Sequence, residues 1–90
     1  MANSQAPDIG PIFGEVLKRH RSVLNVSQEE LAFRAGVDRT FVSRLERGIR
    51  QPTVTTLIGL GLALGISAAE LVRETEVEYL KNIPKLPPTR

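Results

Sequence analysis

Residues 37–48, VDRTFVSRLERG, combine side chains that could bind a polyanion with side chains that belong in a core. On a helical wheel of about 100° per residue, Phe41, Val42 and Leu45 share one face. The remaining face carries Arg39, Thr40, Ser43, Arg44 and Arg47. Guanidinium groups bind phosphates or pair bidentately with guanine edges, and short hydroxyl side chains let a helix approach a groove closely. The stretch therefore predicts a helix that packs through one face and can contact nucleic acid through the other.

The residues just before this stretch predict a second short helix that packs against it. Leu31, Ala32 and Ala35 form a narrow stripe of small and branched side chains, so two helix axes can approach closely. Gly36 can adopt the left-handed conformation that turns the chain sharply into Asp38. Two short helices joined by a glycine-containing turn form a helix-turn-helix unit.

Cap and breaker residues divide the rest of the chain into helices as well. The sequence predicts an all-α fold of five helices, within residues 10–25, 27–36, 38–48, 53–65 and 67–80. Two of them begin with a capping box, S-x-x-E, at Ser27 and Ser67, in which hydroxyl and carboxylate satisfy backbone donors reciprocally. Residues 1–9 are expected to form a flexible arm, 10–80 one domain, and the Pro-rich residues 81–90 an extended tail.

Charge and composition narrow the classes of partner. Residues 15–50 carry eight basic and five acidic residues, whereas residues 66–80 carry one basic and four acidic. A basic front half favours a polyanionic partner, although ordinary solvated charge is an alternative. The chain has no cysteine, no apolar run long enough to span a membrane and no export signal near its start, which together predict a cytoplasmic protein without membrane association.

The run SQEELAFRAGVDRTFVSRLERG, followed by RQPTVTTLIGLGLALGIS, closely resembles the Cro and phage-repressor-type (XRE) helix-turn-helix family. The resemblance covers roughly residues 13–72. It implies a five-helix, lambda-repressor-like domain that binds double-stranded DNA as a transcriptional regulator. It also implies a homodimer on a pseudo-palindromic operator.

The resemblance also assigns site residues. Those at DNA-contacting positions of the family are Gln28, Arg39, Thr40, Ser43, Arg44, Arg47 and Arg50. Gln28 is expected to touch the DNA backbone and neighbouring bases, and residues 39–44 are expected to face base edges. For Arg39 and Arg44 the alternative is exposure without base contact. Arg47 and Arg50 match phosphate or minor-groove positions, and phosphate contacts are the commoner class.

The third predicted helix, which we call the reading helix, contains one acidic residue that has a structural explanation. Glu46 matches a family residue that pairs inward with an arginine of the first helix, here Arg21. The pair should hold the first helix against the third and keep the carboxylate away from DNA.

Homodimerisation is expected to use the fifth helix together with Leu62 of the fourth. Val54, Ile58 and Leu62 form an apolar stripe on the fourth helix that is separate from its core stripe. Since family members commonly dimerise through the region after the fourth helix, the implied interface residues are Leu62, Leu71, Val72 and Tyr79. The alternative is a monomer whose fifth helix closes its own core.

His20 and the glycines of the fourth predicted helix are expected to have structural roles. His20 lies in the apolar stripe of the first helix and is expected to be a partly buried, hydrogen-bonded histidine, with a pH-sensing role as the alternative. Gly59 and Gly61 lie inside a predicted helix, where each costs about 1 kcal/mol relative to Ala, so close neighbours are expected. The segment lacks the spacing of a nucleotide-binding loop, and no metal site or cofactor is expected.

The sequence thus predicts a repressor or autoregulatory controller that acts by occupying DNA. A second hypothesis is an antitoxin-type interaction module whose tail or acidic fifth helix binds a toxin. An enzyme is the weakest interpretation, because no nucleophile is paired with a base.

Overall fold

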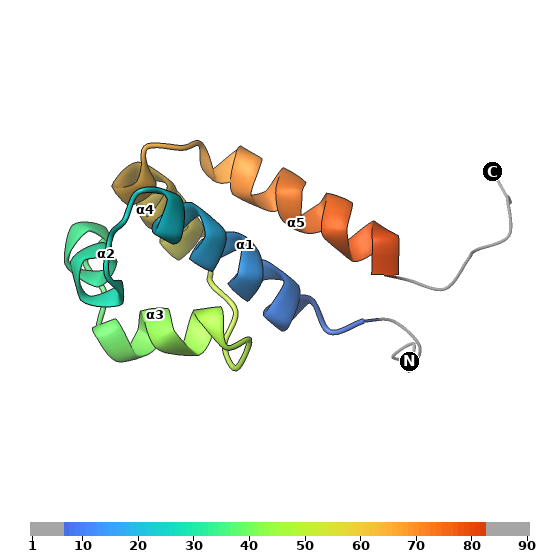
Figure 1. Ribbon diagram of the computed structural model, residues 1–90, viewed down its shortest axis with the longest axis horizontal. Coiled ribbons are helices and arrows are strands. Elements are labelled where there is room, and N and C mark those ends of the chain that lie inside the picture. The colour runs from blue at the N-terminus through green and yellow to red at the C-terminus, as the bar shows by residue number, and fades with distance from the viewer. Residues whose placement is uncertain (1–6, 83–90) are drawn as a thin grey trace, which may run out of the picture.

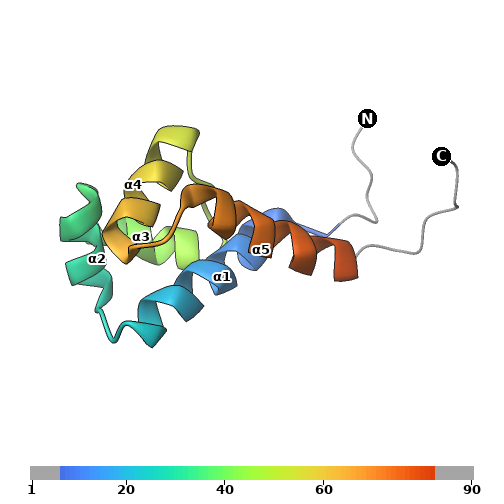
Figure 2. The same ribbon diagram turned by 90° about the horizontal axis from the view of Figure 1, so that it is seen from above.

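The computed structural model describes residues 7–82, and this part of the chain consists of helices joined by short loops (Figure 1). The five helices are α1 (Ile9–Val23), α2 (Gln28–Ala35), α3 (Arg39–Glu46), α4 (Val54–Leu64) and α5 (Ala68–Asn82). Helices α1 and α5 lie side by side and run in opposite directions (Figures 1 and 2). Helix α3 also packs against α1, and α2 packs against α3 and α4. The predicted all-α, five-helix fold is confirmed.

The helix boundaries refine the predicted domain limits. Helix α1 begins at Ile9, and Asp8 caps it through a hydrogen bond from the Gly10 amide to Oδ1 at 3.0 Å. Helix α5 continues to Asn82, two residues beyond the predicted end of the domain at residue 80. The remainder of the predicted arm and tail, residues 1–6 and 83–90, lies outside the described residues.

Only half of each predicted capping box forms. The Ser27 and Ser67 hydroxyls accept from the amides of Glu30 and Glu70, each at 3.0 Å. The carboxylates, predicted to bond back to the caps, instead pair along their own helices, Glu30 with Arg34 and Glu70 with Arg73. The hydrogen bonds from Arg73 are the main reason that the pKa of Glu70 falls to about 2.

The core draws on all five helices and on the loop before α2. Its buried apolar side chains are Phe13, Val16, Leu17, Val26, Leu31, Ala32, Val42, Leu45, Leu60, Leu64 and Leu71. Burying such side chains is the main stabilisation available to a small domain without disulfides.

Within residues 7–82, no single helix is both long and apolar enough to cross a membrane. Helices α4 and α5, which meet at 106°, pass that test of length and composition only as a bent pair.

Besides side-chain contacts, α1 and the end of α3 approach each other closely through their backbones. A methyl group at Gly14 would collide with the carbonyl oxygen of Glu46 and would lie 2.6 Å from that of Leu45. A methyl group at Gly10 would lie 2.6 Å from the carbonyl oxygen of Gly48. Because these contacts leave no room for a Cβ atom, the spacing of two glycines four residues apart fixes how closely α1 approaches the end of α3.

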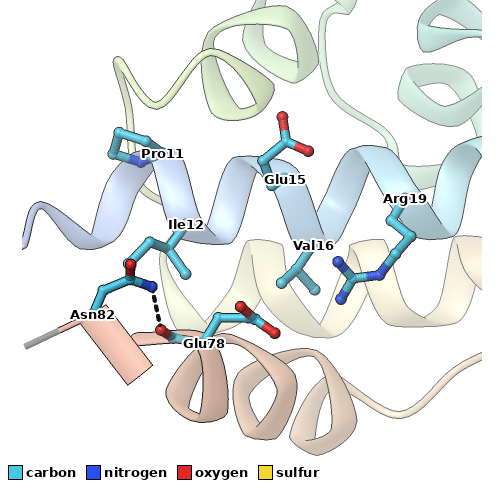
Figure 3. Close-up of a pocket in the computed structure, with 7 residues that line it drawn as sticks. All are labelled: Pro11, Ile12, Glu15, Val16, Arg19, Glu78 and Asn82. Carbon is cyan, nitrogen blue, oxygen red and sulfur yellow. Dashed lines mark hydrogen bonds between the residues drawn. The ribbon is translucent and has the colours of Figure 1, made fainter. Parts of the chain in front are cut away.

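The contact between α1 and α5 is different, because a groove of about 450 Å³ runs along it (Figure 3). Ile12, Glu15 and Arg19 of α1 line one side, and Glu78 and Asn82 of α5 line the other. The Asn82 amide folds back onto its own helix by donating to the Glu78 carbonyl oxygen at 2.7 Å. The groove therefore lies between α1 and the C-terminal part of α5.

Candidate nucleic-acid interface

Helix α3 has one buried face and one exposed face, as its sequence predicted. Val42 and Leu45 are fully buried, and Phe41 is half-buried at the edge of the core. On the outer side Arg39, Thr40 and Arg44 are exposed, and Ser43 is half-buried. Three anchoring side chains thus hold the helix while its polar residues stay accessible.

Four arginines follow one another along α3 and the loop after it: Arg39, Arg44, Arg47 and Arg50. All four are exposed, and none pairs with an acidic side chain among residues 7–82. Unpaired guanidinium groups on one segment create a positive potential that attracts phosphates. The arrangement suits an extended polyanion better than a small ligand, because the arginines span the whole segment.

The predicted ion pair between Arg21 and Glu46 is present and joins α1 to α3. Arg21 donates from Nε to Glu46 Oε2 at 2.6 Å and from Nη2 to Oε1 at 3.0 Å. The Glu46 side chain is 4% exposed and that of Arg21 15%. The hydrogen bond to Glu46 raises the pKa of Arg21 above its ordinary value, outweighing the opposite effect of burial. Arg21 of α1 therefore neutralises the Glu46 carboxylate of the reading helix, α3.

Gln28 lies at the first residue of α2 and is half-buried. Its amide nitrogen Nε2 donates to Glu46 Oε1 at 2.9 Å. From the family resemblance, Gln28 was expected only to contact DNA. The structure adds an intramolecular bond that the sequence did not predict.

The turn between α2 and α3 has the predicted conformation at Gly36, with φ of 72°. The amide of Val37 donates to the Ala32 carbonyl oxygen at 3.0 Å, which closes the end of α2. Asp38 occupies the predicted N-cap position of α3, but its side chain makes no capping hydrogen bond. The geometry of the turn therefore depends on its backbone and on helix packing.

The residues predicted at a dimer interface separate into two groups. Leu62 is 80% exposed and Val72 is 46% exposed, while Tyr79 is half-buried. Leu71, by contrast, is fully buried in the core of its own chain, so its assignment to a dimer interface is wrong. The physical reason is that Leu71 lies one residue before Val72 on α5, which turns it inward toward α1 and α4.

The predicted second stripe on α4 is exposed. Val54 is 71% exposed and Ile58 is 51% exposed, and both lie on the same face of the helix as Leu62. Helix α5 does not cover this stripe. Together with Leu62, these side chains form an apolar surface larger than scattered exposed residues would give.

His20 is half-buried and hydrogen-bonded, as predicted. Its Nε2 lies 2.8 Å from Glu74 Oε1 on α5, and Arg19 Nη2 donates to the same oxygen at 3.2 Å. Both contacts bridge α1 and α5. His20 therefore has a structural partner on the side of α1 that faces away from α3.

Two features that position α3 are not apparent from sequence reasoning. One is the close backbone approach at Gly10 and Gly14, for which the four-residue glycine spacing was the available signal. The other is the contact of Arg21 Nη1 with the Val26 carbonyl oxygen at 2.9 Å. It ties the loop between α1 and α2 into the same ion-pair network.

Comparison with known proteins decides the family to which this arrangement belongs. The family model described as helix-turn-helix matches residues 17–71, which include α2, the turn and α3. The chain belongs to the helix-turn-helix family. It is accordingly a regulator of the DNA-binding type, and the family is one of transcriptional regulators rather than of enzymes.

Relatives of similar length share most of this helix-turn-helix chain. The control protein C.SmaI of Serratia marcescens is 40% identical over 75 residues, covering 83% of this chain and 86% of the relative. An HTH-type transcriptional regulator, y4dJ, of Sinorhizobium fredii is 42% identical over 69 residues, covering 77% and 90%.

Solved structures match the same helices. The restriction-modification controller protein C.AhdI from Aeromonas hydrophila superposes with a TM-score of 0.67 at 39% identity, covering 71% of this chain and 96% of that chain. A variant of the controller protein C.Esp1396I, in a crystal structure with its highest-affinity operator site, gives a TM-score of 0.73 at 28% identity, covering 82% and 97%.

Proposed function

We propose that the protein is a controller-type transcriptional regulator that binds a pseudo-palindromic DNA operator as a homodimer. The observation that carries this proposal is the row of exposed arginines on α3 and its following loop, which have no ion-pair partner within residues 7–82. Helix α1 supports α3 from the opposite side. The similarity to controller proteins, one of them seen with its operator, supports it.

In this proposal the residues of the outer face of α3 have different roles. Arg39, Thr40, Ser43 and Arg44 face base edges in the major groove, where arginine pairs bidentately with guanine. Arg47 and Arg50 lie toward the end of the helix and contact phosphates, which fix the register of the protein on the duplex. Gln28, at the start of α2, reaches the DNA backbone beside them.

The dimer proposed here uses the exposed apolar residues of α4 and α5. Leu62, Val72 and Tyr79 remain from the predicted interface, and Val54 and Ile58 extend the apolar surface of α4. A two-fold axis through this surface would pair it with itself and place the two α3 helices in successive major grooves, roughly 34 to 36 Å apart. The operator would then be an inverted repeat.

Regulation in this proposal depends on how fully the operator is occupied, and therefore on protein concentration. Described residues 7–82 form a single five-helix domain without a separate effector module. Access to DNA places the protein in the cytoplasm. The antitoxin alternative depended on residues 81–90 or α5 and gains no support from the relatives found.

Selection of bound sequences from a pool of random duplexes tests the proposal. An inverted repeat should be recovered, and the mass of the complex should correspond to two chains per duplex. Recovery of no common sequence, or of a single asymmetric half-site bound by one chain, would overturn it.

Arg44→Ala tests direct base readout within the selected operator. We expect the variant to lose about 1 to 3 kcal/mol of binding free energy and to relax base preference at one symmetric pair of positions. Arg73→Ala is the matched control, because Arg73 lies on α5 and pairs with Glu70. Equal loss of affinity in both variants would show that only overall charge matters.

A further inference from the structure

The carboxylate of Glu46 accepts hydrogen bonds from two residues, only one of which is its ion-pair partner. Arg21 provides Nε at 2.6 Å and Nη2 at 3.0 Å, and Gln28 provides Nε2 at 2.9 Å. The Glu46 side chain is 4% exposed, so water has little access to replace these donors. The site connects α1, α2 and the last residue of α3.

The chemistry of the carboxylate fixes which way the Gln28 amide faces. An ionised carboxylate only accepts hydrogen bonds, so the amide must turn its NH₂ group toward Glu46. The carbonyl oxygen and the second N–H of Gln28 then remain for an external partner. Hydrogen bonds to a charged acceptor are stronger than those between neutral groups, which favours one orientation over free rotation.

We infer that Glu46 is a positioning residue for DNA binding, which holds the Gln28 amide so that its second N–H and carbonyl oxygen face the duplex. This inference rests on the proposed DNA-binding function. Glu46 itself does not touch DNA, because Arg21 neutralises it and the protein covers it. Its effect on affinity passes through Gln28, whose amide reaches the duplex already oriented.

Orientation before binding reduces the loss of conformational freedom on association. A glutamine side chain is rich in rotamers, and immobilising one in a complex weakens binding. The Glu46 contact meets that cost during folding instead. Arg21 holds Glu46 in place but makes no hydrogen bond with the Gln28 amide, so the two donors can be separated by mutation.

A nuclear magnetic resonance measurement on the unmutated protein tests the orientation without DNA. One side-chain amide proton of Gln28 should resonate downfield of those of Gln51 and exchange with water roughly tenfold more slowly. Gln51 is the internal reference, because it is exposed and makes no side-chain hydrogen bond with a described residue. Two Gln28 protons that behave like those of Gln51 would overturn the inference.

A double-mutant cycle on the selected operator tests the effect on binding. Gln28→Ala should weaken binding roughly five- to tenfold in the wild-type background and less than about twofold in a Glu46→Ala background. In an Arg21→Met background, which breaks the ion pair but retains the Gln28 acceptor, the full loss should return. The same factor in all three backgrounds would show that Glu46 acts only on the fold.

The two measurements separate this inference from the proposed function. If the wild-type protein selects no duplex, the DNA-binding proposal fails, and the resonance comparison still decides whether Glu46 holds the amide. If Glu46→Ala does not fold, which circular dichroism would show, the unmutated protein still provides that comparison.

Discussion

Helix α1 is held by α3 on one side and by α5 on the other, and the two contacts differ in kind. Toward α3 the backbones touch at Gly10 and Gly14, and the buried pair of Arg21 and Glu46 closes the far end. Such contacts leave no space for adjustment, because a close-packed interior does not deform continuously. The orientation of the reading helix is therefore set by the fold before DNA arrives.

Toward α5 the same helix makes side-chain contacts and also lines a groove (Figure 3). Glu74 accepts from Arg19 and lies against His20, and Leu71 reaches the core. Partly exposed ion pairs of this type are worth less than buried ones. We therefore expect substitutions on the α3 side of α1 to cost more stability than those in the ion pairs on its α5 side.

Gly14→Ala should produce the largest loss of stability, because it disrupts the close backbone contact between α1 and α3. The added methyl group would meet two backbone carbonyl groups that cannot rotate away. We expect a loss of about 3 kcal/mol in the free energy of unfolding, measured by urea denaturation followed by circular dichroism. Stability equal to that of the unmutated protein would show that the α1–α3 contact is not rigid.

Arg21→Met should have the next largest effect. It leaves the Glu46 carboxylate buried without its cation, and it removes the bond to the Val26 carbonyl oxygen. Since Arg21 is 15% exposed and some water can replace it, we expect a loss of about 2 to 3 kcal/mol in the free energy of unfolding. Arg34→Met is the matched control, because its pair with Glu30 is exposed on α2. Equal losses would contradict the contrast between buried and exposed pairs.

Glu74→Gln should have a smaller effect that is confined to the α5 side. It removes the charge that Arg19 and His20 share, which we expect to cost about 0.5 to 1 kcal/mol and to speed amide hydrogen exchange in α5 more than in α3. Glu76→Gln is the control, because Glu76 is exposed on the same helix and has no ion pair with a described residue. Faster exchange in α3 would show that the two sides of α1 are coupled.

The sequence predicted the helices well because local rules determine them. Side-chain caps at Ser27 and Ser67 and a left-handed residue at Gly36 appear where they were expected. The Arg21–Glu46 pair followed from resemblance to a family rather than from spacing. The helices could therefore be predicted from the residues, and part of their packing from the resemblance to a family.

The rest could not be predicted, because it depends on distances between helices. Leu71 was assigned to an interface from the family resemblance, whereas the packing of α5 buries it in the core of its own chain. The Gln28 amide could equally bind water, and only the position of α3 brings Glu46 within reach. Gly10 was interpreted as the start of a helix, but its close contact with the backbone at Gly48 better explains why a glycine is needed there.

Gly59→Ala should give a change as small as that of Glu74→Gln, but in the opposite direction. A methyl group at Gly59 would lie 3.5 Å from the Ala35 carbonyl oxygen, which is ordinary van der Waals contact. Alanine also restricts the unfolded chain more than glycine does, so we expect a gain of about 0.5 to 1 kcal/mol in the free energy of unfolding.

Gly61→Ala, two residues further along α4, is the control for Gly59→Ala. There the methyl group would lie 2.6 Å from the Ile66 carbonyl oxygen and 3.0 Å from the Ala68 amide nitrogen, so stability should fall. Opposite signs in the two variants would show that backbone contact, rather than helix propensity, decides where α4 needs glycine. A loss in both would mean that α4 lies closer to α2 than the Ala35 distance indicates, because only such an approach would make Gly59 as crowded as Gly61.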